Sequence, residues 1–333
     1  MKVLFVTTES HGLQLDQKII CDLLLAQARR QEFELKIETL TIPATFQPQH
    51  VTLQNANLQI HPDQDAIFFL ERVYSFDWPF AKAKRILIPN VEYVNPQTAA
   101  LLPSIDMCWH KTRFSYAQFM QHMPHAQHSY MGFTSVDPAS RVSRYDSFAH
   151  FRGKALGRHS EEIINVWKRN PDFPLLKYHF YQDSVGAFSF DEWLVCRNMA
   201  IQAGKMEPAK YTAELASAGF HLCTSGSEGF GHYINEARAM AAIPIILNAP
   251  PMNELVDEEC GVLVEPLHSI ERSFSRHFFT NEEEIQKAIR RALQLSDTER
   301  RLRGEKARRR FETERVAFHQ NLDILFGTLR SAL

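Results

Sequence analysis

The segment CTSGSEGFGHYINEA, residues 223–237, decides the fold of the second half of the chain. It follows an apolar run predicted as a strand, Phe220–Thr224, and leads into a predicted helix, Asn235–Ala242. Gly229 and Gly231 allow the backbone to approach a ligand closely. The N–H groups at the start of the helix favour an anion such as a diphosphate. Two carboxylates eight residues apart, Glu228 and Glu236, could accept hydrogen bonds from hydroxyl groups of one ligand.

Strands and helices alternate on both sides of this segment. The predicted strands are Lys2–Thr7, Phe33–Leu40, Ala66–Leu70, Arg85–Ile88, Ile105–Trp109, Leu175–Phe180, Met199–Ala203, Phe220–Thr224, Pro244–Leu247 and Gly261–Val264. Predicted helices include Pro208–Ala218 and the amphipathic Asn281–Leu295. This alternation predicts parallel, doubly wound α/β sheets.

The length of 333 residues suggests two domains. The sequence becomes rich in Ser, Asp, Pro and Arg over residues 136–149, so we place a boundary there. The predicted units are an acceptor-side Rossmann-like domain over 1–148 and a nucleotide-sugar-binding Rossmann-like domain over 149–315. A C-terminal helix over 316–333 could pack back on the N-terminal domain.

The segments that follow the loop at 223–237 extend the pattern. They are AAIPIIL at 241–247, NELV at 253–256 and GVLVEP at 261–266. Together they resemble retaining glycosyltransferases of family 4, which share a Glu-x7-Glu element. The similarity covers about residues 205–312, and over 1–150 it is only architectural. It implies the GT-B fold, in which two Rossmann-like domains face a central cleft.

The resemblance implies roles for the residues of this loop. Glu236 would hold the ribose hydroxyls of the donor, and Glu228 would approach the donor sugar. The backbone at Gly229, Phe230 and Gly231 would meet sugar and phosphate, and His232 could face the sugar. The structural alternative is a glycine turn capped by ordinary helix carboxylates, with His232 as a cap residue.

A second segment, GKALGRHS at 153–160, resembles the Gly-Arg that ends the first strand of the family's C-terminal domain. Arg158 could therefore grip phosphate oxygens in bidentate fashion. The family's following Lys is missing, because Glu161 and Glu162 stand in its place. Lys154, Lys168 or Lys205 could replace it, and Lys205 directly follows a predicted strand. Solvated loop residues are the alternative interpretation of Arg158 and Lys205.

In the N-terminal half, polar residues follow three predicted strands, where ligands of doubly wound sheets bind. Gly12 lies in the first loop, where the family often has two glycines. Asn90 stands where many members have a catalytic His, with Glu92 two residues on, so these two are candidate catalytic residues with Glu228. His110 and Lys111 could meet phosphate or an anionic acceptor. Each could also be an ordinary turn or buried residue.

The implied reaction is displacement at an anomeric carbon with a nucleoside diphosphate leaving. The resemblance implies retention of configuration and transfer to a glycan, a lipid-linked or another acceptor, as in surface polysaccharide synthesis. The sequence shows no His/Cys ligand cluster, and the resemblance implies a donor site without a divalent metal, so we expect neither metal nor cofactor. Two alternatives are another GT-B nucleotide-sugar enzyme, such as an epimerase, and a non-catalytic nucleotide-sugar-binding subunit.

The composition and net charge of the chain indicate which binding partners and which cellular location to expect. The formal net charge of -2 gives no reason to expect nucleic acid. Five scattered cysteines fit reduced thiols, and the N-terminal sequence turns polar too early for a signal peptide. We therefore expect a cytoplasmic protein. The basic segment 300–310 is interleaved with Glu and predicts a solvated helix face, while peripheral contact with the inner face of a membrane is an alternative.

Overall fold

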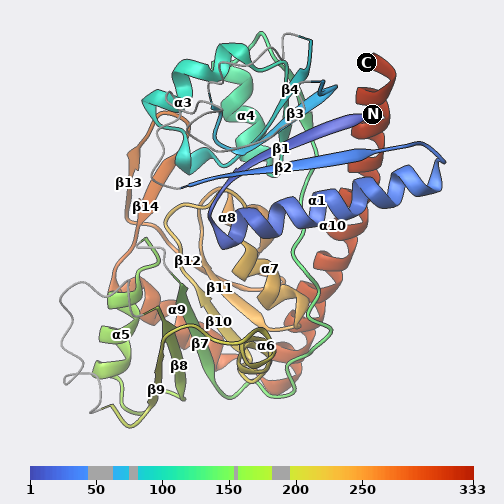
Figure 1. Cartoon of the computed structure of the whole chain (residues 1–333). Coiled ribbons are helices and arrows are strands. Elements are labelled where there is room, and N and C mark those ends of the chain that lie inside the picture. The colour runs from blue at the N-terminus through green and yellow to red at the C-terminus, as the bar shows by residue number, and fades with distance from the viewer. Residues whose placement is uncertain (44–62, 75–81, 154–156, 182–195) are drawn as a thin grey trace. The chain divides into compact units, whose positions relative to one another are not determined.

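The structure is a computed structural model that describes residues 1–43, 63–74, 82–153, 157–181 and 196–333. The described chain divides into two compact units (Figure 1). The first comprises Met1–Phe133, Arg272–Ser275 and Glu314–Leu333, and the second comprises Thr134–Glu271 and Arg276–Thr313. Each unit holds a six-stranded sheet whose neighbouring strands are all parallel. The predicted pair of Rossmann-like α/β domains is therefore confirmed.

The sheet of the first unit has the order β2-β1-β3-β4-β5-β6. Its strands are β1 (Lys2–Thr8), β2 (Lys36–Ile42), β3 (Ala66–Glu71), β4 (Lys84–Pro89), β5 (Met107–His110) and β6 (Gln127–Tyr130). β3 is buried at every position, as a parallel strand covered on both faces must be. The order reverses between β1 and β3, and ligands of such sheets bind at the carboxyl ends near that point.

Helices cover the sheet of the first unit. α1 (His11–Arg30) lies against β1 and β3, and α4 (Arg113–His122) lies against β5 and β6. Short helices fill the segment between β4 and β5, namely η1 (Val91–Tyr93), α3 (Pro96–Leu101) and η2 (Leu102–Ser104). β2 begins at Lys36, three residues later than predicted. The N–H of Phe33 instead donates to the carbonyl of Ala28 and closes the end of α1.

The sheet of the second unit has the order β12-β11-β10-β7-β8-β9. Its strands are β7 (Phe148–Gly153), β8 (Leu176–Phe180), β9 (Met199–Ala203), β10 (Phe220–Cys223), β11 (Ile243–Leu247) and β12 (Val262–Val264). Its helices before the C-terminal helix are α5 (Ser160–Arg169), α6 (Pro208–Ala216), α7 (His232–Ala239), α8 (Met252–Leu255) and α9 (Glu282–Gln294). The sequence did not predict β7, because His150 and Arg152 interrupt its apolar pattern although both are buried.

The units divide between Phe133 and Thr134, whereas the sequence placed the boundary after residue 148. The polar segment between these points belongs to the second unit. The N–H of Val142 donates to the carbonyl of Met240 at 2.9 Å, and the Tyr145 hydroxyl donates to the carbonyl of Ala241 at 2.7 Å. The change in composition therefore marks an extended segment of the second unit, not the linker itself.

A two-stranded antiparallel hairpin, β13 (His268–Glu271) and β14 (Arg276–Phe279), follows β12. Its strands belong to the second unit and its tip, Arg272–Ser275, to the first. At the tip, the Phe274 ring lies 4.7 Å from that of Phe119, measured between centroids. The sequence did not predict this hairpin, because β13 is exposed throughout and lacks apolar alternation.

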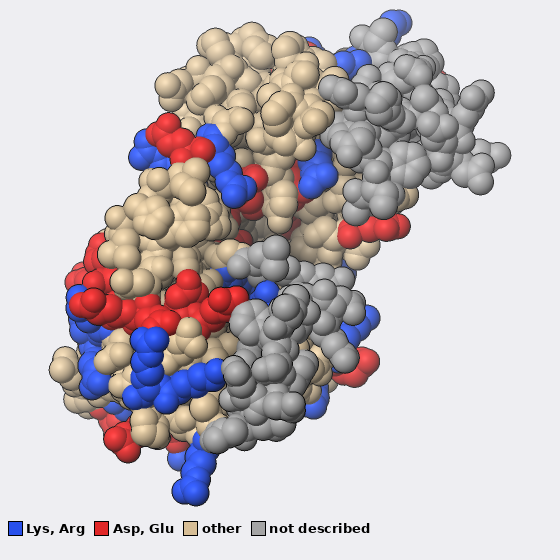
Figure 2. Space-filling model, turned by 90° about the vertical axis from the view of Figure 1, so that its left-hand side faces the viewer, with Lys and Arg blue, Asp and Glu red and all other residues tan. Residues whose placement is uncertain are grey.

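The last helix, α10 (Asp297–Ala332), carries the basic segment 300–310. Most of these cations have partners inside the second unit. Arg308 bonds to Asp137 and Glu312, Arg310 bonds to Asp257, and Lys306 bonds to Glu259. The ion pairs hold these three cations against the second unit, as expected for a helix face of the protein itself. Elsewhere on the surface, Figure 2 shows acidic side chains beside basic ones.

From Glu314 onward α10 belongs to the first unit. There the amide of Gln27 donates to the carbonyl of Asp323 at 2.8 Å, and Arg30 pairs with the Asp323 carboxylate at 2.7 Å. Among the helices in the described ranges, none combines the length and apolar character needed to cross a bilayer.

Three histidines, His110, His150 and His221, are buried in the two sheets. Their ring nitrogens bond to neutral groups such as the carbonyls of Leu222 and Leu215. Burial lowers the pKa of His110 and His150 to about 3 and that of His221 to about 4. All three are therefore neutral in the folded protein at physiological pH.

These histidines predict that the protein loses stability in acid. Their folded pKa values lie below the unfolded value near 6.5, so unfolding takes up protons once the pH falls below 6.5. The loss at pH 5 is about 2 kcal/mol for each histidine. Urea denaturation at pH 7.5 and pH 5 measures it. His221→Gln should flatten the pH dependence and His125→Gln, at an exposed position, should not; a wild-type protein equally stable at both pH values would contradict the account.

Candidate functional site

Two loops at the carboxyl ends of β7 and β10 form the candidate site of the second unit. The strands are neighbours in the sheet, with Phe220 opposite Phe148, so the loops that follow them meet. The N–H of Gly226 donates to the carbonyl of Gly157 at 2.8 Å, and the Thr224 hydroxyl donates to the carbonyl of Arg158 at 2.8 Å. This is the edge of a parallel sheet at which ligands bind.

The hairpin strand β14 contacts both loops. The N–H of Phe278 donates to the carbonyl of Gly226 at 2.8 Å. The ring of His277 occupies the space where a Cβ would stand on either glycine, 2.6 Å from that position on Gly157 and 2.8 Å on Gly226. At Gly226 a Cβ would also stand 2.3 Å from the carbonyl oxygen of Phe278, so the close backbone approach requires glycine there, whereas at Gly157 the nearest atoms belong to the His277 ring.

His159 holds the loop after β7 in place through its buried ring. Its backbone is left-handed, with φ of 50°, and its ring is buried. Nδ1 lies 2.7 Å from the carbonyl of Thr224, and Nε2 accepts the N–H of Thr280 at 3.3 Å. The His159 ring thereby links the loop after β10 to the residue that follows β14. His159 thus orders the adjacent Arg158.

Arg158 is half-buried over the ring of Tyr233, with its guanidinium carbon 4.1 Å from the ring centroid. One terminal nitrogen donates to the carbonyl of Phe151 at 2.6 Å, and the other lies 4.0 Å from Glu228. A guanidinium has five N–H donors, so these contacts leave donors for an anion. The structure therefore places Arg158 beside Glu228, and the sequence analysis assigned both residues to one donor site.

The two carboxylates of the Glu-x7-Glu pattern are both half-buried and positioned by hydroxyl groups. The Ser225 hydroxyl donates to Glu228 at 2.6 Å, and the Tyr211 hydroxyl donates to Glu236 at 2.8 Å. Burial and the neighbouring Glu236 charge raise the pKa of Tyr211 well above its ordinary value, so it remains a donor. Tyr211 was missed in the sequence, because it lies on α6, outside both motifs.

The remaining loop residues have distinct positions. Gly229, Phe230 and Gly231 are buried, and Gly231 precedes α7 with φ of 95°. His232 begins α7, and its Nδ1 lies 2.7 Å from the Ser135 hydroxyl. Lys205 is exposed after the edge strand β9, which β8 separates from β7, so the sheet does not bring it beside Arg158. Lys154 falls outside the described residues.

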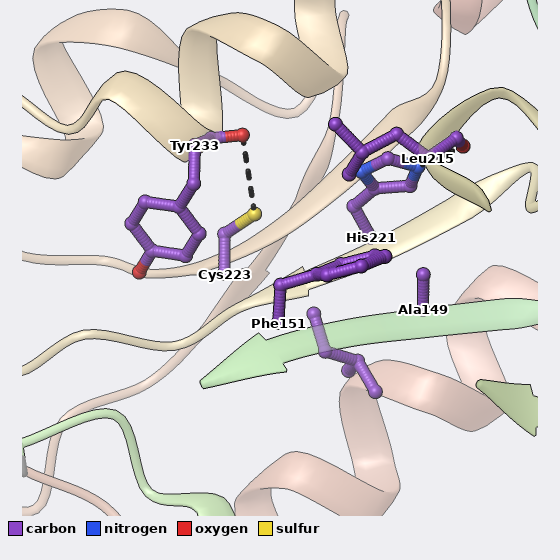
Figure 3. Close-up of a pocket in the computed structure, with 7 residues that line it drawn as sticks. Ala149, Phe151, Leu215, His221, Cys223 and Tyr233 are labelled. Atoms are coloured by element: carbon purple, nitrogen blue, oxygen red, sulfur yellow. Dashed lines mark hydrogen bonds between the residues drawn. The ribbon is translucent and has the colours of Figure 1, made fainter. Parts of the chain in front are cut away.

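A small cavity lies beneath this loop. Its volume is about 10 Å³, and its lining includes Phe151, Cys223 and Tyr233 (Figure 3). Such a volume holds at most one water molecule, so the cavity is a packing void. Burial raises the pKa of the Cys223 thiol, and the thiol lies 3.9 Å from the carbonyl of Tyr233. Cys223 is therefore a core residue rather than a nucleophile.

In the first unit, two of the residues proposed for the acceptor side are buried. Lys111 forms an ion pair with Asp16 at 2.7 Å, with both side chains almost fully buried. His110 bonds to Ser115 at 2.9 Å and to His128 at 2.9 Å. Gly12 lies in the first turn of α1. The contacts of Lys111 and His110 stabilise the sheet edge and give no surface for a phosphate group.

Asn90 contacts a carboxylate that the sequence analysis did not select, and Glu92 lies two residues further on in η1. The amide of Asn90 donates to Glu71 at 3.1 Å, and both side chains are buried. Glu71 ends β3 with φ of 73°. Burial raises its pKa. A carboxylate at the end of the apolar run AIFFLE was the signal that could have identified it.

One group of metal-ligating side chains occurs among the described residues, namely Cys108, His110 and His128. Its imidazoles already have hydrogen-bond partners. His110 Nε2 and His128 Nδ1 bond to each other at 2.9 Å, and His128 Nε2 lies 2.8 Å from the carbonyl of Met123. We therefore interpret the group as a hydrogen-bonded chain within the sheet.

Comparison with solved structures places the fold in the GT-B class. Sucrose-phosphate synthase from Thermosynechococcus elongatus aligns over all of both chains, with a TM-score of 0.69 and 11% identity. The lipopolysaccharide outer core galactosyltransferase WaaB aligns over 100% of this chain and 99% of its own, with a TM-score of 0.65 and 10% identity. Anabaena HepE, solved with UDP and glucose, aligns over all of both chains with a TM-score of 0.64 and 14% identity.

At these identities the likeness establishes the fold alone. No known family profile matches the sequence, and no curated protein matches it.

The glycine contacts of the site predict the effect of Gly226→Ala. The new Cβ would stand 2.3 Å from the carbonyl oxygen of Phe278, so the loop or the hairpin must move. We expect the free energy of unfolding to fall by about 1–3 kcal/mol. Gly327→Ala is the control, because that glycine lies in α10 with open space around it and should gain about 0.5–1 kcal/mol. Equal stability of Gly226→Ala and wild type would show that the contact is not tight.

Proposed function

We propose that this protein is a glycosyltransferase that moves a sugar from a nucleotide-sugar donor to an acceptor, with retention of configuration and without a metal ion. The observation that carries the proposal is the grouping of Arg158, Glu228 and Glu236 at one sheet edge in the second unit. The cation is held against one of the acids, and each acid is held by a hydroxyl group. The GT-B fold and its UDP-bound neighbour support this interpretation.

Each residue has a role that follows from its chemistry. Glu236 accepts hydrogen bonds from the ribose hydroxyls, and Tyr211 holds it in place through a hydroxyl donor at 2.8 Å. A carboxylate with one oxygen so engaged still has acceptor capacity for two hydroxyls. Glu228 lies closer to Arg158 and accepts from hydroxyls of the donor sugar.

The diphosphate leaves with negative charge, so the site must stabilise that charge as the bond at the anomeric carbon breaks. Arg158 supplies a guanidinium that remains protonated throughout the physiological range. The first N–H groups of a helix lack intrahelical acceptors, so the start of α7 after Gly231 adds donors and a favourable dipole. In this proposal these groups serve where other transferases use a divalent cation.

Donor binding provides the first test of this assignment. Thermal-shift screening against UDP-, GDP-, ADP- and dTDP-sugars should identify a ligand that raises the melting temperature. Transfer or slow hydrolysis of that donor would exclude a purely binding subunit. Release of an epimer without an acceptor would favour the epimerase instead.

We expect transferase activity to persist in EDTA. Loss of that activity, with recovery on adding Mg²⁺, would contradict the metal-independent proposal.

Glu236→Ala tests the ribose contact. Removal of a charged hydrogen-bond partner should weaken the binding of that nucleoside diphosphate about tenfold to a hundredfold by calorimetry. Tyr211→Phe should weaken it less, because the carboxylate remains and only its orientation is released. Glu283→Ala is the control, since this exposed acid lies on α9 and pairs with Lys287. Unchanged affinity in Glu236→Ala would overturn the site assignment.

A further inference from the structure

An open pocket of about 410 Å³ lies in the first unit at the carboxyl ends of β3 and β4. It is lined by Arg72, which follows β3, by the segment Glu92–Asn95 after β4, and by Arg272 and Ser273 of the hairpin tip. All these residues belong to the first unit. The volume suits a small molecule, and the position lies beside the point where the strand order reverses.

A strained turn places Arg72 in this pocket. The N–H of Arg72 donates to the carbonyl of Leu70 at 2.9 Å around Glu71, whose φ is 73°. This is the rare γ-turn, a conformation that is strained for a residue other than glycine. Asn90 bonds to one oxygen of Glu71, and Arg72 lies 3.3 Å from the other, so the turn is fixed from two sides. Strain held in this way at a sheet edge marks a functional position.

The side chains of the pocket combine two cations with an aromatic ring. Arg72 lies over Tyr93, 5.7 Å from the ring centroid, and the Tyr93 side chain is 46% exposed. Arg272 is exposed at the hairpin tip. Across this turn the N–H of Arg272 donates to the carbonyl of Ser275, and the N–H of Ser275 donates to the carbonyl of Arg272. Glu92 is the one acid among the lining residues, and Arg72 also lies 3.3 Å from the buried Glu71, so the cationic character of the open pocket comes mainly from the exposed Arg272.

Each component favours a particular part of a ligand. Guanidinium groups bind phosphate or carboxylate oxygens in bidentate geometry. An exposed tyrosine ring offers a flat apolar face to a sugar ring, and Glu92 and Asn95 can accept hydrogen bonds from hydroxyls. The combination selects a sugar that carries a negative charge.

We propose that this pocket binds the acceptor, and that the acceptor is an anionic saccharide whose phosphate or carboxylate lies between Arg72 and Arg272. The inference rests on the proposed transferase function and adds the class of acceptor to it. It also moves the anionic contact from the buried Lys111 and His110 to residues that line an open pocket.

Protection from an arginine-specific reagent tests the pocket directly. The full chain is treated with phenylglyoxal in the presence of glucose 6-phosphate, glucuronate or glucose, and labelling is read by mass spectrometry. Each sugar is present at about 10 mM, roughly ten times a dissociation constant of 1 mM. We expect either anionic sugar, or both, to lower labelling of Arg272 several-fold, while glucose does not. Arg276, on the same hairpin but outside the pocket, is the control and should label equally in all samples.

The outcomes separate phosphate from carboxylate and separate this inference from the transferase proposal. Protection by one anion alone identifies the acceptor group, whereas equal labelling of Arg272 in all samples overturns the inference.

Arg272→Gln should raise KM for the anionic acceptor about tenfold or more, with KM for the donor unchanged. Equal KM values in Arg272→Gln and Arg276→Gln would also overturn it. A protein that binds donor yet fails these tests loses only the acceptor assignment; one that binds no nucleotide sugar loses the transferase proposal.

Discussion

The candidate site depends on the close approach of two backbone loops at Gly157 and Gly226. A single N–H to carbonyl bond joins them, and the His277 ring fills the space that a Cβ on either residue would need. The positions of Arg158 and Glu228 follow from this contact, because each lies within two residues of one glycine. A side chain at Gly226 would meet the carbonyl oxygen of Phe278, so the loop that carries Glu228 or the hairpin would have to move. The space available at these glycines therefore sets the positions of the charged groups.

Hydrogen bonds to neutral groups orient the charged residues of both units. Ser225 and Tyr211 hold the acids of the second unit, while Asn90 holds Glu71 in the first. These bonds fix the acids beside nearby cations, with Arg158 at 4.0 Å from Glu228 and Arg72 at 3.3 Å from Glu71, so the geometry is set before a ligand binds. The buried pair of Lys111 and Asp16 is different, since each charge there is already matched inside the protein.

The parts of the fold with strong periodic patterns could be predicted from the sequence. β1 and β3 are nearly continuous apolar runs, and their positions were predicted to within one residue. The sequence assigned Arg158 and Glu228 to one donor site, whereas their contact with each other is seen only in the structure. β7 and the hairpin could not be predicted, because His150 is accommodated only by specific buried partners and β13 has no buried face. Tyr211 and Arg272 lie far along the sequence from the other residues of their sites, so only the tertiary structure shows that they belong to them.

The central claim is that the loops after β7 and β10 bind a nucleoside diphosphate. A crystal structure of the protein with UDP, or with whichever nucleoside diphosphate binds most tightly, tests it most directly. The account predicts phosphate oxygens within hydrogen-bond distance of the Arg158 guanidinium and ribose hydroxyls on the Glu236 carboxylate. Clear density for the nucleotide elsewhere, with Arg158 and Glu236 unliganded, would contradict it.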